Sequence, residues 1–460
     1  MKIMLSADHY SFSEIEDIVN KADNIYTVQF LTNNKNKHRQ LKEISGYNVE
    51  YIFDNLLNKY DINSEKYEDS DEVMNILRSV LNDENTNLFY DRPTTLMNFG
   101  TGVHNYFKYI SDLVFKEYVT FKTYQPDCVF FVSSPHQIES WIKARVAELL
   151  SIKVLIIHKA PLPGRKYVME GLGRTPELCN LNSNICNETS NEVDEFVSKV
   201  QSDYRIAIPD YEKKRLKRNK GKYFNFKQEL LRWWKKPHFI YNKYKCYQRY
   251  KELSIKPEFN KKVITFFLHY QPERTTLPEG YGFTQQIIAI KALRMAVPDD
   301  TEILVKEHPS TFTNQCNPKV RHSSLYDSIN RIKGVSLVNL DITPFELIDK
   351  SILVGTITGN VGVEALIRGK PVVYFGVSVI QDFKWAHSYV NQKELVNFIN
   401  NINEYENIND VIKSDTVKIL YNSLNNSIPL NNEDDYSISG AMRLRNIKII
   451  KYLINGYIKV

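Results

Sequence analysis

The stretch that decides the fold runs from Leu268 to Ser310 and reads LHYQPERTTLPEGYGFTQQIIAIKALRMAVPDDTEILVKEHPS. Two apolar runs typical of buried strands, Val263–Leu268 and Ile303–Val305, each end in a polar cluster, HYQPERTT and KEHPS. The helical pattern Gln285–Met295 separates them, so the stretch predicts a βαβ unit. Ligands of open parallel sheets bind beyond the carboxyl ends of the strands, so we expect a binding site at these clusters. Their imidazole and cationic side chains suit a phosphorylated ligand.

Strand and helix patterns alternate in both halves of the chain, which predicts an α/β fold with two Rossmann-like domains facing a cleft. In the first half we expect strands at Lys2–Ser6, Ile25–Leu31, Asp127–Val132 and Ile152–Ile157, and helices at Ser13–Lys21, Asn105–Thr123 and Gln137–Leu150. The second pattern begins at Lys261. We predict an N-terminal α/β domain at residues 1–205, a basic, aromatic helical insert at 206–258, a second α/β domain at 259–390 and a helical tail at 391–460.

The composition is that of a soluble globular protein, with 460 residues of which 42% are hydrophobic and 25% charged. The N-terminus reaches Asp8 too soon for a signal peptide, and no apolar run is long enough to predict a membrane span. The five cysteines form no Cys-x-x-Cys pair and no metal-ligand spacing. We therefore expect no structural zinc and a cytoplasmic location.

Positive charge is concentrated in residues 211–252, where fifteen Lys and Arg and three Glu give a local charge of +12. The whole chain carries +6, so the remainder carries −6 by the same count. Aromatic residues, including Trp233 and Trp234, are interleaved with the charges. This pattern fits a helix on an anionic membrane surface, stacking on nucleic acid, or a solvated insert. Nucleic acid is the least favoured partner, because no recognised nucleic-acid motif accompanies the insert.

Three clusters in the second half combine residue types that bind phosphate or carboxylate. The turn Thr356–Asn360 joins a strand to a helix, so its backbone N–H groups favour an anion, although an ordinary N-cap would look the same. His308 follows a strand, where it could stabilise charge on a leaving phosphate or be purely structural. Arg274 can clamp a carboxylate or phosphate. The candidate residues are His269, Gln271, Arg274, Lys306, Glu307, His308, Pro309, Ser310, Thr356, Thr358, Gly359, Asn360 and Glu364.

The candidates of the first half lie at two further strand ends. Glu139 falls on the first turn of a predicted helix, where it could be a general base or a nucleophile, or could simply cap the helix. His136 precedes it as a second catalytic candidate. Lys159 and Arg165 follow the next strand and suit an anionic acceptor. No Gly-x-Gly-x-x-Gly follows the first strand, so we expect no dinucleotide cofactor.

Several motifs recur in one order along the chain. They are Ser134-Pro135-His136, Leu162-Pro163-Gly164-Arg165, HYQPERTT from His269, Lys306-Glu307-His308-Pro309, Thr358-Gly359 and EALIRGKP from Glu364. In this order they resemble capsular polysaccharide biosynthesis proteins, a family related to the bacterial Kdo transferases of capsule assembly. The resemblance covers roughly residues 125–376.

The resemblance implies a GT-B glycosyltransferase that moves an acidic sugar, Kdo or another nonulosonic acid, from a CMP-activated donor to a glycan acceptor, which includes a lipid-linked one. It also implies that His308 contacts the CMP phosphate, as in sialic-acid transferases, and that Thr356, Thr358 and the Gly359 amide lie near it. Glu364 would hold the ribose or the cytidine, and Arg274 and Gln271 would face a sugar. Neither a metal nor a further cofactor is implied. With the basic segment at 211–252, the hypothesis becomes a cytoplasmic enzyme that is peripheral at the inner face of the membrane and recruits its acceptor near this segment.

Gln137 departs from the resemblance, because many relatives have an acidic residue directly after Pro-His. Glu139 is the nearest remaining carboxylate, so inverting and retaining chemistry both stay open. Two alternatives stand beside the CMP-sugar transferase. One is a transferase or epimerase of the same build that uses a UDP-sugar. The other is a non-catalytic glycan-binding or export-coupling protein in which Gln137 marks lost chemistry.

Overall fold

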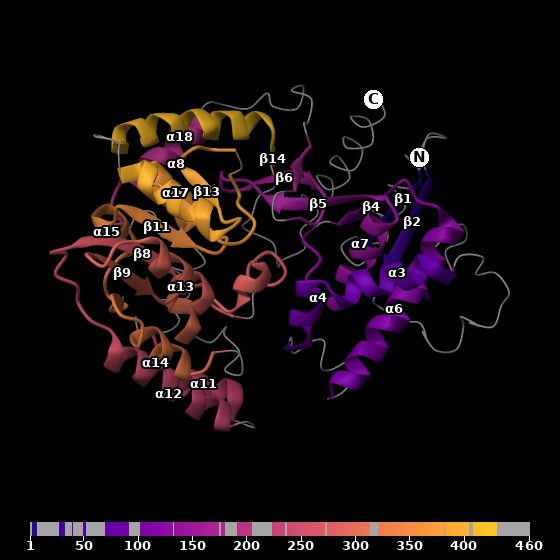
Figure 1. Ribbon diagram of the computed structural model, residues 1–460, viewed down its shortest axis with the longest axis horizontal. Helices are drawn as coiled ribbons and strands as arrows, with labels where there is room; N and C mark the ends of the chain where they lie inside the picture. Colours follow the sequence, from indigo (N-terminus) through magenta and orange to yellow (C-terminus); the bar gives the residue numbers. More distant parts are fainter. Residues whose placement is uncertain are drawn as a thin grey trace. The chain divides into compact units, whose positions relative to one another are not determined.

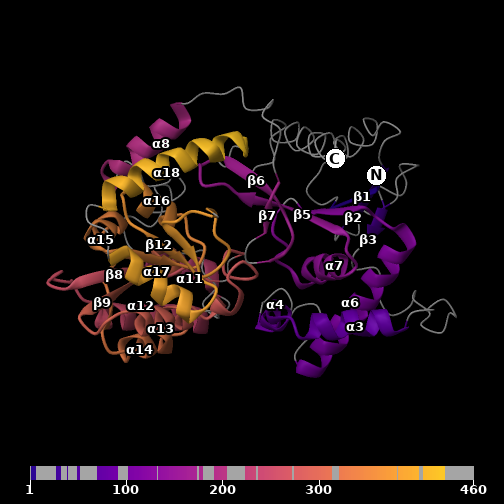
Figure 2. The ribbon, with the colours of Figure 1, turned by 45° about the horizontal axis from the view of Figure 1, so that its top comes forward.

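The computed structural model describes residues 2–6, 27–32, 39, 49–51, 70–91, 102–131, 133–173, 176–179, 191–204, 223–234, 237–271, 274–312, 321–380, 382–403 and 408–429. They belong to two compact units (Figures 1 and 2), one drawn from residues 1–187 and 423–460 and the other from 188–422. The helix expected at Ser13–Lys21 lies outside the described residues. No described helix is both long and apolar enough to cross a membrane.

The first unit is built on a mixed sheet with the strand order β14-β6-β5-β4-β1-β2-β3, and β7 pairs with β6. The neighbours from β5 to β3 are parallel, whereas β6 is antiparallel to β5. The strands are β1 (Lys2–Ser6), β2 (Thr27–Thr32), β3 (Val49–Tyr51), β4 (Cys128–Phe131), β5 (Lys153–Lys159), β6 (Arg165–Glu170), β7 (Glu177–Leu178) and β14 (Ile428–Pro429). The helices are α3 (Ser70–Leu81), α4 (Glu84–Leu88), α6 (Val103–Tyr124) and α7 (Ile138–Leu149).

The second unit has a six-stranded sheet in the order β10-β9-β8-β11-β12-β13, and all of its pairs are parallel. Its strands are β8 (Lys262–Phe267), β9 (Thr301–Lys306), β10 (Val335–Leu337), β11 (Leu353–Thr356), β12 (Val372–Tyr374) and β13 (Ala386–Ser388). The helix α13 (Ile287–Ala296) joins β8 to β9, which confirms the predicted βαβ unit. Two Rossmann-like α/β units are therefore present, as the alternating patterns predict.

The remaining helices of the second unit pack around this sheet. They are α8 (Asn191–Gln201), α11 (Phe226–Trp233), α12 (Pro237–Leu253), α14 (Ser324–Asn330), α15 (Pro344–Lys350), α16 (Val361–Ile367), α17 (Gln392–Asn403) and most of α18 (Ile408–Asn425), with short 3-10 turns η4 (Tyr281–Thr284) and η5 (Pro309–Phe312). The buried core lies between the sheet and the helices and includes Ile264, Phe266, Leu293 and Val305. Burial of these apolar side chains is the main force that holds strand and helix together.

The compact units divide the chain at other positions than the predicted domain boundaries of 205, 258 and 390. The helix α8 belongs to the second unit, where Arg368 Nη1 donates to the carbonyl of Val200 at 2.7 Å. The helices of the basic segment also belong there, because Tyr250 of α12 is part of the second core. At the other end, the described residues 423–429 belong to the first unit, where Tyr167 donates to the Ser423 hydroxyl at 2.6 Å.

Gly362 of α16 lies so close to β12 that a side chain there would overlap the hydroxyl of Tyr374. That hydroxyl is fully buried and has no hydrogen-bond partner within the described structure. We predict that Gly362→Ala lowers the stability by about 1–3 kcal/mol, because the added methyl group overpacks this contact. Tyr374→Phe alone should change the stability little, since the hydroxyl makes no bond that is lost.

The double variant Gly362→Ala/Tyr374→Phe should recover part of the loss, because a ring without the hydroxyl can withdraw from the methyl group. Thermal melting of the four proteins measures this coupling. Strictly additive losses would show that the Tyr374 hydroxyl is not the obstacle.

Candidate functional site

The strands β9, β8 and β11 are neighbours in the second sheet and run in parallel, so their carboxyl ends meet at one edge. The polar clusters after these strands therefore come together, as the sequence predicts. The clusters after β8 and β11 are in direct contact. The His269 Nε2 atom lies 3.2 Å from the Thr356 hydroxyl and accepts a hydrogen bond of 3.3 Å from the Thr358 amide.

His269 is buried, and its backbone groups and both ring nitrogens have polar contacts with the protein. Its backbone N–H donates to the Gln286 side chain at 2.7 Å, and the Gln286 amide donates back to its carbonyl at 2.9 Å. Because the Thr358 N–H donates to Nε2, the proton of the neutral ring is at Nδ1, which lies 3.4 Å from the Thr275 hydroxyl. His269 therefore holds the turn after β11 in place, and its ring is already occupied by protein groups.

Only glycine fits at position 359 of this turn. A Cβ there would lie 2.7 Å from the Thr356 hydroxyl and 3.3 Å from His269 Nε2. The Thr356 side chain is fully buried, and the Thr358 hydroxyl donates to the carbonyl of Thr275 at 2.9 Å. Thr356 and Thr358 thus form the buried part of the turn and hold it in place, whereas Gly359 and Asn360 form its more accessible part.

The loop after β8 packs onto this turn. Arg274 forms an ion pair with Glu279, with 3.2 Å between Nε and Oε1, and about a quarter of the Arg274 side chain is exposed. The carbonyl of Glu279 accepts from the Val377 amide at 2.8 Å, which ties the loop to the end of β12. The Gln271 side chain donates to the Thr284 carbonyl at 2.9 Å and so closes the loop on itself. The partly exposed guanidinium of Arg274 is therefore the positively charged group of this loop that a ligand can reach.

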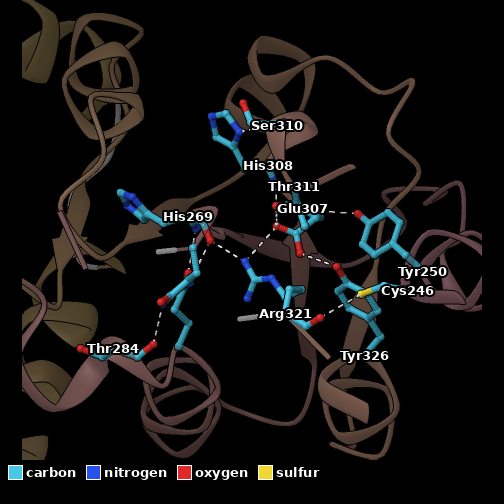
Figure 3. Close-up of polar contacts among 12 residues, drawn as sticks. Cys246, Tyr250, His269, Thr284, Glu307, His308, Ser310, Thr311, Arg321 and Tyr326 are labelled. Carbon is cyan, nitrogen blue, oxygen red and sulfur yellow. Dashed lines mark hydrogen bonds and ion pairs between the residues drawn. The ribbon is translucent and has the colours of Figure 1, made fainter. Parts of the chain in front are cut away.

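Glu307 has no exposed surface and is the centre of a hydrogen-bond network (Figure 3). Its carboxylate accepts from the His308 amide at 2.8 Å, the Thr311 hydroxyl at 3.0 Å, Arg321 Nη2 at 3.2 Å and the Tyr326 hydroxyl at 2.6 Å. A buried carboxylate is stable only when it is paired and hydrogen-bonded in this way. Glu307 therefore positions the strand end and has no atom with which to touch a ligand.

Arg321 was not predicted from the sequence. Its Nη2 donates both to Glu307 and to the carbonyl of His269, so one guanidinium joins the ends of β8 and β9. Tyr250 completes the network from α12 by accepting a hydrogen bond of 3.1 Å from the Glu307 amide. Arg321 lies in no motif, and only the need of a buried glutamate for a cationic partner could have suggested that such an arginine exists.

The imidazole of His308 is half-exposed and lies on the opposite side of the strand end from the Glu307 carboxylate (Figure 3). The backbone N–H of Ser310 donates to its Nδ1 atom at 3.1 Å, so the proton of the neutral ring is at Nε2. The ring of Tyr270 packs against it, with 5.1 Å between centroids. Pro309 and the buried Ser310 form the first residues of η5 and fix this orientation. His308 is thus preset as an Nε2–H donor.

Lys306 is not the accessible cation for phosphate that the sequence predicts. Its side chain is buried, and Nζ donates to the Asn339 carbonyl at 2.6 Å. Burial lowers the pKa of Lys306 to about 7, although the nearby Asp341 and Glu346 act in the opposite direction. Its ammonium charge is therefore only partly present at neutral pH. Glu364 is half-exposed on α16, one turn beyond Asn360.

In the first unit, the strand ends of β4 and β5 carry the other candidates. His136 is half-buried, and its Nδ1 donates to the Ser134 carbonyl at 3.1 Å, so Nε2 is the acceptor atom of the neutral ring. Glu139 is buried within α7 and accepts a hydrogen bond of 2.7 Å from the Tyr109 hydroxyl. Proton transfer to Nε2 of His136 is therefore geometrically simpler than transfer to Glu139.

The two predicted acceptor-binding residues differ in their surroundings. Lys159 ends β5 and is half-exposed. Arg165 is buried, and its Nη1 donates to the carbonyls of Leu424 and Ser427 at 3.4 and 3.2 Å. These bonds hold the returning C-terminal segment against β6. Arg165 thus has a structural partner that the sequence did not predict.

Comparison with known families bears directly on the second unit. Residues 199–382 match the family model described as capsule polysaccharide biosynthesis protein. The resemblance to these proteins is confirmed for this stretch. It contains every candidate from His269 to Glu364 and also the basic segment. It leaves out His136, Glu139, Lys159 and Arg165.

No curated protein matches the chain. Solved structures give distant likenesses. The β-Kdo 2,4-transferase KpsC of Thermosulfurimonas dismutans is 15% identical with a TM-score of 0.29, and the alignment covers 59% of this chain and 78% of that one. A glycosyltransferase from Rickettsia africae is 11% identical over 98% and 97% of the two chains, with a TM-score of 0.31. The UDP-GlcNAc 2-epimerase of Neisseria meningitidis, bound to UDP-GlcNAc, is 14% identical over 92% and 99%, with a TM-score of 0.23.

The dual contact of Arg321 predicts that its loss affects more than stability. Arg321→Met should destabilise the protein by about 3 kcal/mol, because it leaves the buried Glu307 carboxylate without its cation. Tyr326→Phe is the matched control, since it also removes one donor from Glu307 but does not touch His269. This control should cost about 1 kcal/mol.

Only the arginine variant should expose His269 to modification by diethyl pyrocarbonate, located by mass spectrometry of the folded protein. Equal modification of His269 in both variants would contradict the link that Arg321 makes between the two strand ends.

Proposed function

We propose that this chain is a glycosyltransferase of surface-polysaccharide assembly. It transfers Kdo or another nonulosonic acid from a CMP-activated donor to a glycan acceptor, including a lipid-linked one. The observation that carries the proposal is His308, a preset Nε2–H donor at the carboxyl edge of a parallel sheet, within a stretch that matches capsule polysaccharide biosynthesis proteins. Such an edge is where α/β folds bind their ligands.

The donor phosphate binds at the edge formed by His308 and the turn after β11. As the sugar leaves, the phosphate of CMP gains negative charge, and the Nε2–H of His308 stabilises it. The Gly359 N–H donates to the Thr356 hydroxyl at 3.3 Å, so the backbone N–H of Asn360 is the group that this turn contributes to the phosphate. Stabilisation of the leaving group needs no metal in this scheme, so a chelator should leave the rate unchanged.

The sugar and nucleoside are held by the more accessible side chains of the same unit. Arg274 is suited to the sugar carboxylate, because a guanidinium binds a carboxylate with two parallel hydrogen bonds. Glu364 accepts from ribose or cytidine hydrogen-bond donors. The buried residues Glu307, Thr356 and Thr358 act by positioning these groups. Lys159 in the first unit provides a half-exposed cation for an anionic acceptor.

Proton abstraction from the acceptor hydroxyl is assigned to His136. Its Nδ1 donates to the Ser134 carbonyl, which leaves Nε2 as the basic atom of the neutral ring. Glu139 is buried and holds Tyr109. Gln137 stands where the resemblance leads us to expect an acidic residue. With His136 as the base, no carboxylate is needed at that position.

The donor prediction is tested with a panel of CMP- and UDP-sugars. CMP-sugars should raise the melting temperature and be consumed only when an acceptor is present. His308→Ala should lower kcat/KM by about 100-fold or more, which is typical for the loss of a donor to a developing anion. His322→Ala is the matched control, since His322 is an exposed histidine of the same unit whose ring bonds to Ser324 at the start of α14. This variant should keep kcat/KM near the wild-type value even if it melts at a lower temperature.

Three outcomes would contradict the proposal. Consumption of a UDP-sugar but not of CMP-sugars would identify another donor. Turnover of a nucleotide sugar without an acceptor would identify an epimerase. Glycan binding without any binding of sugar nucleotides would identify a non-catalytic protein.

The assignment of the base is tested by pH–rate profiles. His136→Gln should lower kcat by about 100-fold or more and remove the rise of the rate with pH that deprotonation of the base produces. Glu139→Gln should retain most of the activity, because its amide can still accept from Tyr109. A Glu139→Gln variant that melts like the wild type and is as inactive as His136→Gln would assign the base to Glu139.

A further inference from the structure

The helices α11 and α12 carry a concentration of exposed apolar side chains that the transferase site does not use. Fourteen large hydrophobic residues are exposed in the described part of the chain, and six of them lie between residues 226 and 244. They are between 43% and 68% exposed and comprise Phe226, Leu230, Leu231, Trp234, Tyr241 and Tyr244. Apolar groups gathered in this way generally mark a binding surface.

The helix period places Phe226, Leu230 and Leu231 on one side of α11. Phe226 and Leu230 are four residues apart and share a stripe, and Lys227 and Leu231 form the adjacent stripe. The opposite side of the helix is buried through Glu229, which forms an ion pair with Lys243 of α12 at 2.8 Å. The buried ion pair fixes the rotation of α11, so the leucines and the phenylalanine face outward.

The helix α12 continues the same organisation. Tyr241, Tyr244 and Lys245 are exposed and lie within one turn. The opposite side is buried, and the Tyr250 hydroxyl donates to the carbonyl of Val338 at 2.5 Å. The two helices pack against each other, and α12 packs against α14 at the margin of the second unit (Figure 1). The exposed aromatic and aliphatic groups therefore stand on a rigid base.

The segment of sequence that contains these helices is strongly basic. Residues 211–252 carry a net +12 in the sequence. Two of the cations, Lys243 and Arg249, are paired with protein carboxylates. Lys227 and Lys245 are exposed among the apolar residues. A surface of this kind combines groups that enter an apolar layer with groups that bind the anions at its boundary.

We propose that α11 and α12 form a surface that docks onto an anionic lipid bilayer. We name it the lipid-docking surface and define it by Phe226, Lys227, Leu230, Leu231, Trp234, Tyr241, Tyr244 and Lys245. Leucine and phenylalanine enter the acyl boundary, tryptophan and tyrosine lie at the headgroup level, and lysines bind lipid phosphates. Nucleic acid would use the aromatic groups and lysines but not the exposed leucines. The inference does not depend on the donor sugar.

Vesicle co-sedimentation of the full chain tests this inference. The protein should bind vesicles that contain phosphatidylglycerol and should not bind vesicles of phosphatidylcholine alone. Phe226→Ser/Leu231→Ser should weaken binding by about tenfold or more, because two apolar side chains no longer leave water. Lys227→Glu/Lys245→Glu should weaken it to a similar degree, and raising the salt to about 1 M should do the same.

A matched control comes from α13 of the same unit. Ile288 and Met295 are 48% and 69% exposed, so Ile288→Ser/Met295→Ser removes a similar amount of apolar surface elsewhere. This control should bind vesicles like the wild type. Equal loss in the control and in Phe226→Ser/Leu231→Ser would overturn the proposal. Binding of single-stranded RNA together with no binding of anionic vesicles would also overturn it.

Tryptophan fluorescence provides a second test on the folded wild type. Trp141 and Trp385 are buried, whereas Trp234 is 66% exposed. Addition of anionic vesicles should shift the emission to shorter wavelength in the wild type and in Trp233→Phe alike, and Trp234→Phe should abolish most of this shift. Sedimentation with vesicles but no change in emission would mean that another part of the chain makes the contact.

Discussion

The buried carboxylate of Glu307 is the charge on which the candidate site depends. An ionised group without exposed surface is tolerated only if other groups of the protein replace its water shell. Here the replacement comes from different elements, because Arg321 precedes α14, Tyr326 belongs to α14 and Thr311 to η5. The same arginine donates to the carbonyl of His269. Neutralising one buried charge therefore fixes the ends of β8 and β9 relative to each other.

This arrangement gives the two strand-end histidines different tasks. His269 accepts a backbone hydrogen bond at Nε2 and is surrounded by protein groups, so it holds the turn after β11. His308 accepts at Nδ1 from Ser310 and is half-exposed, so the proton of its neutral ring is at Nε2. A backbone N–H group determines the tautomer of each neutral ring. Two histidines that follow neighbouring strands can thus have different tasks: His269 holds a turn in place, and His308 is placed to bind a ligand.

The sequence predicts the local elements well, because apolar periodicity reports which side of a strand or helix is buried. The βαβ unit around α13 and the helices α6 and α7 occur where the patterns place them. Contacts between distant segments have no such signal. Arg165 meets the segment near Ser427 across 262 residues, and Arg321 meets His269 across 52. Burial shows which candidate residues hold the structure together and which can reach a ligand. Because burial depends on contacts between distant segments, the sequence alone could not make this distinction.

Among the residues that the structure describes, the charges of the candidate edge suit the donor with one phosphate that is proposed above. Lys306 is buried and only partly protonated at neutral pH, and Arg321 is committed to Glu307. Arg274 is partly neutralised by Glu279. A nucleoside diphosphate sugar brings two phosphates and therefore more negative charge to compensate. A CMP-sugar brings one phosphate and one sugar carboxylate. The His308 donor, the Asn360 backbone N–H and the partly neutralised Arg274 match the smaller charge of the donor proposed above.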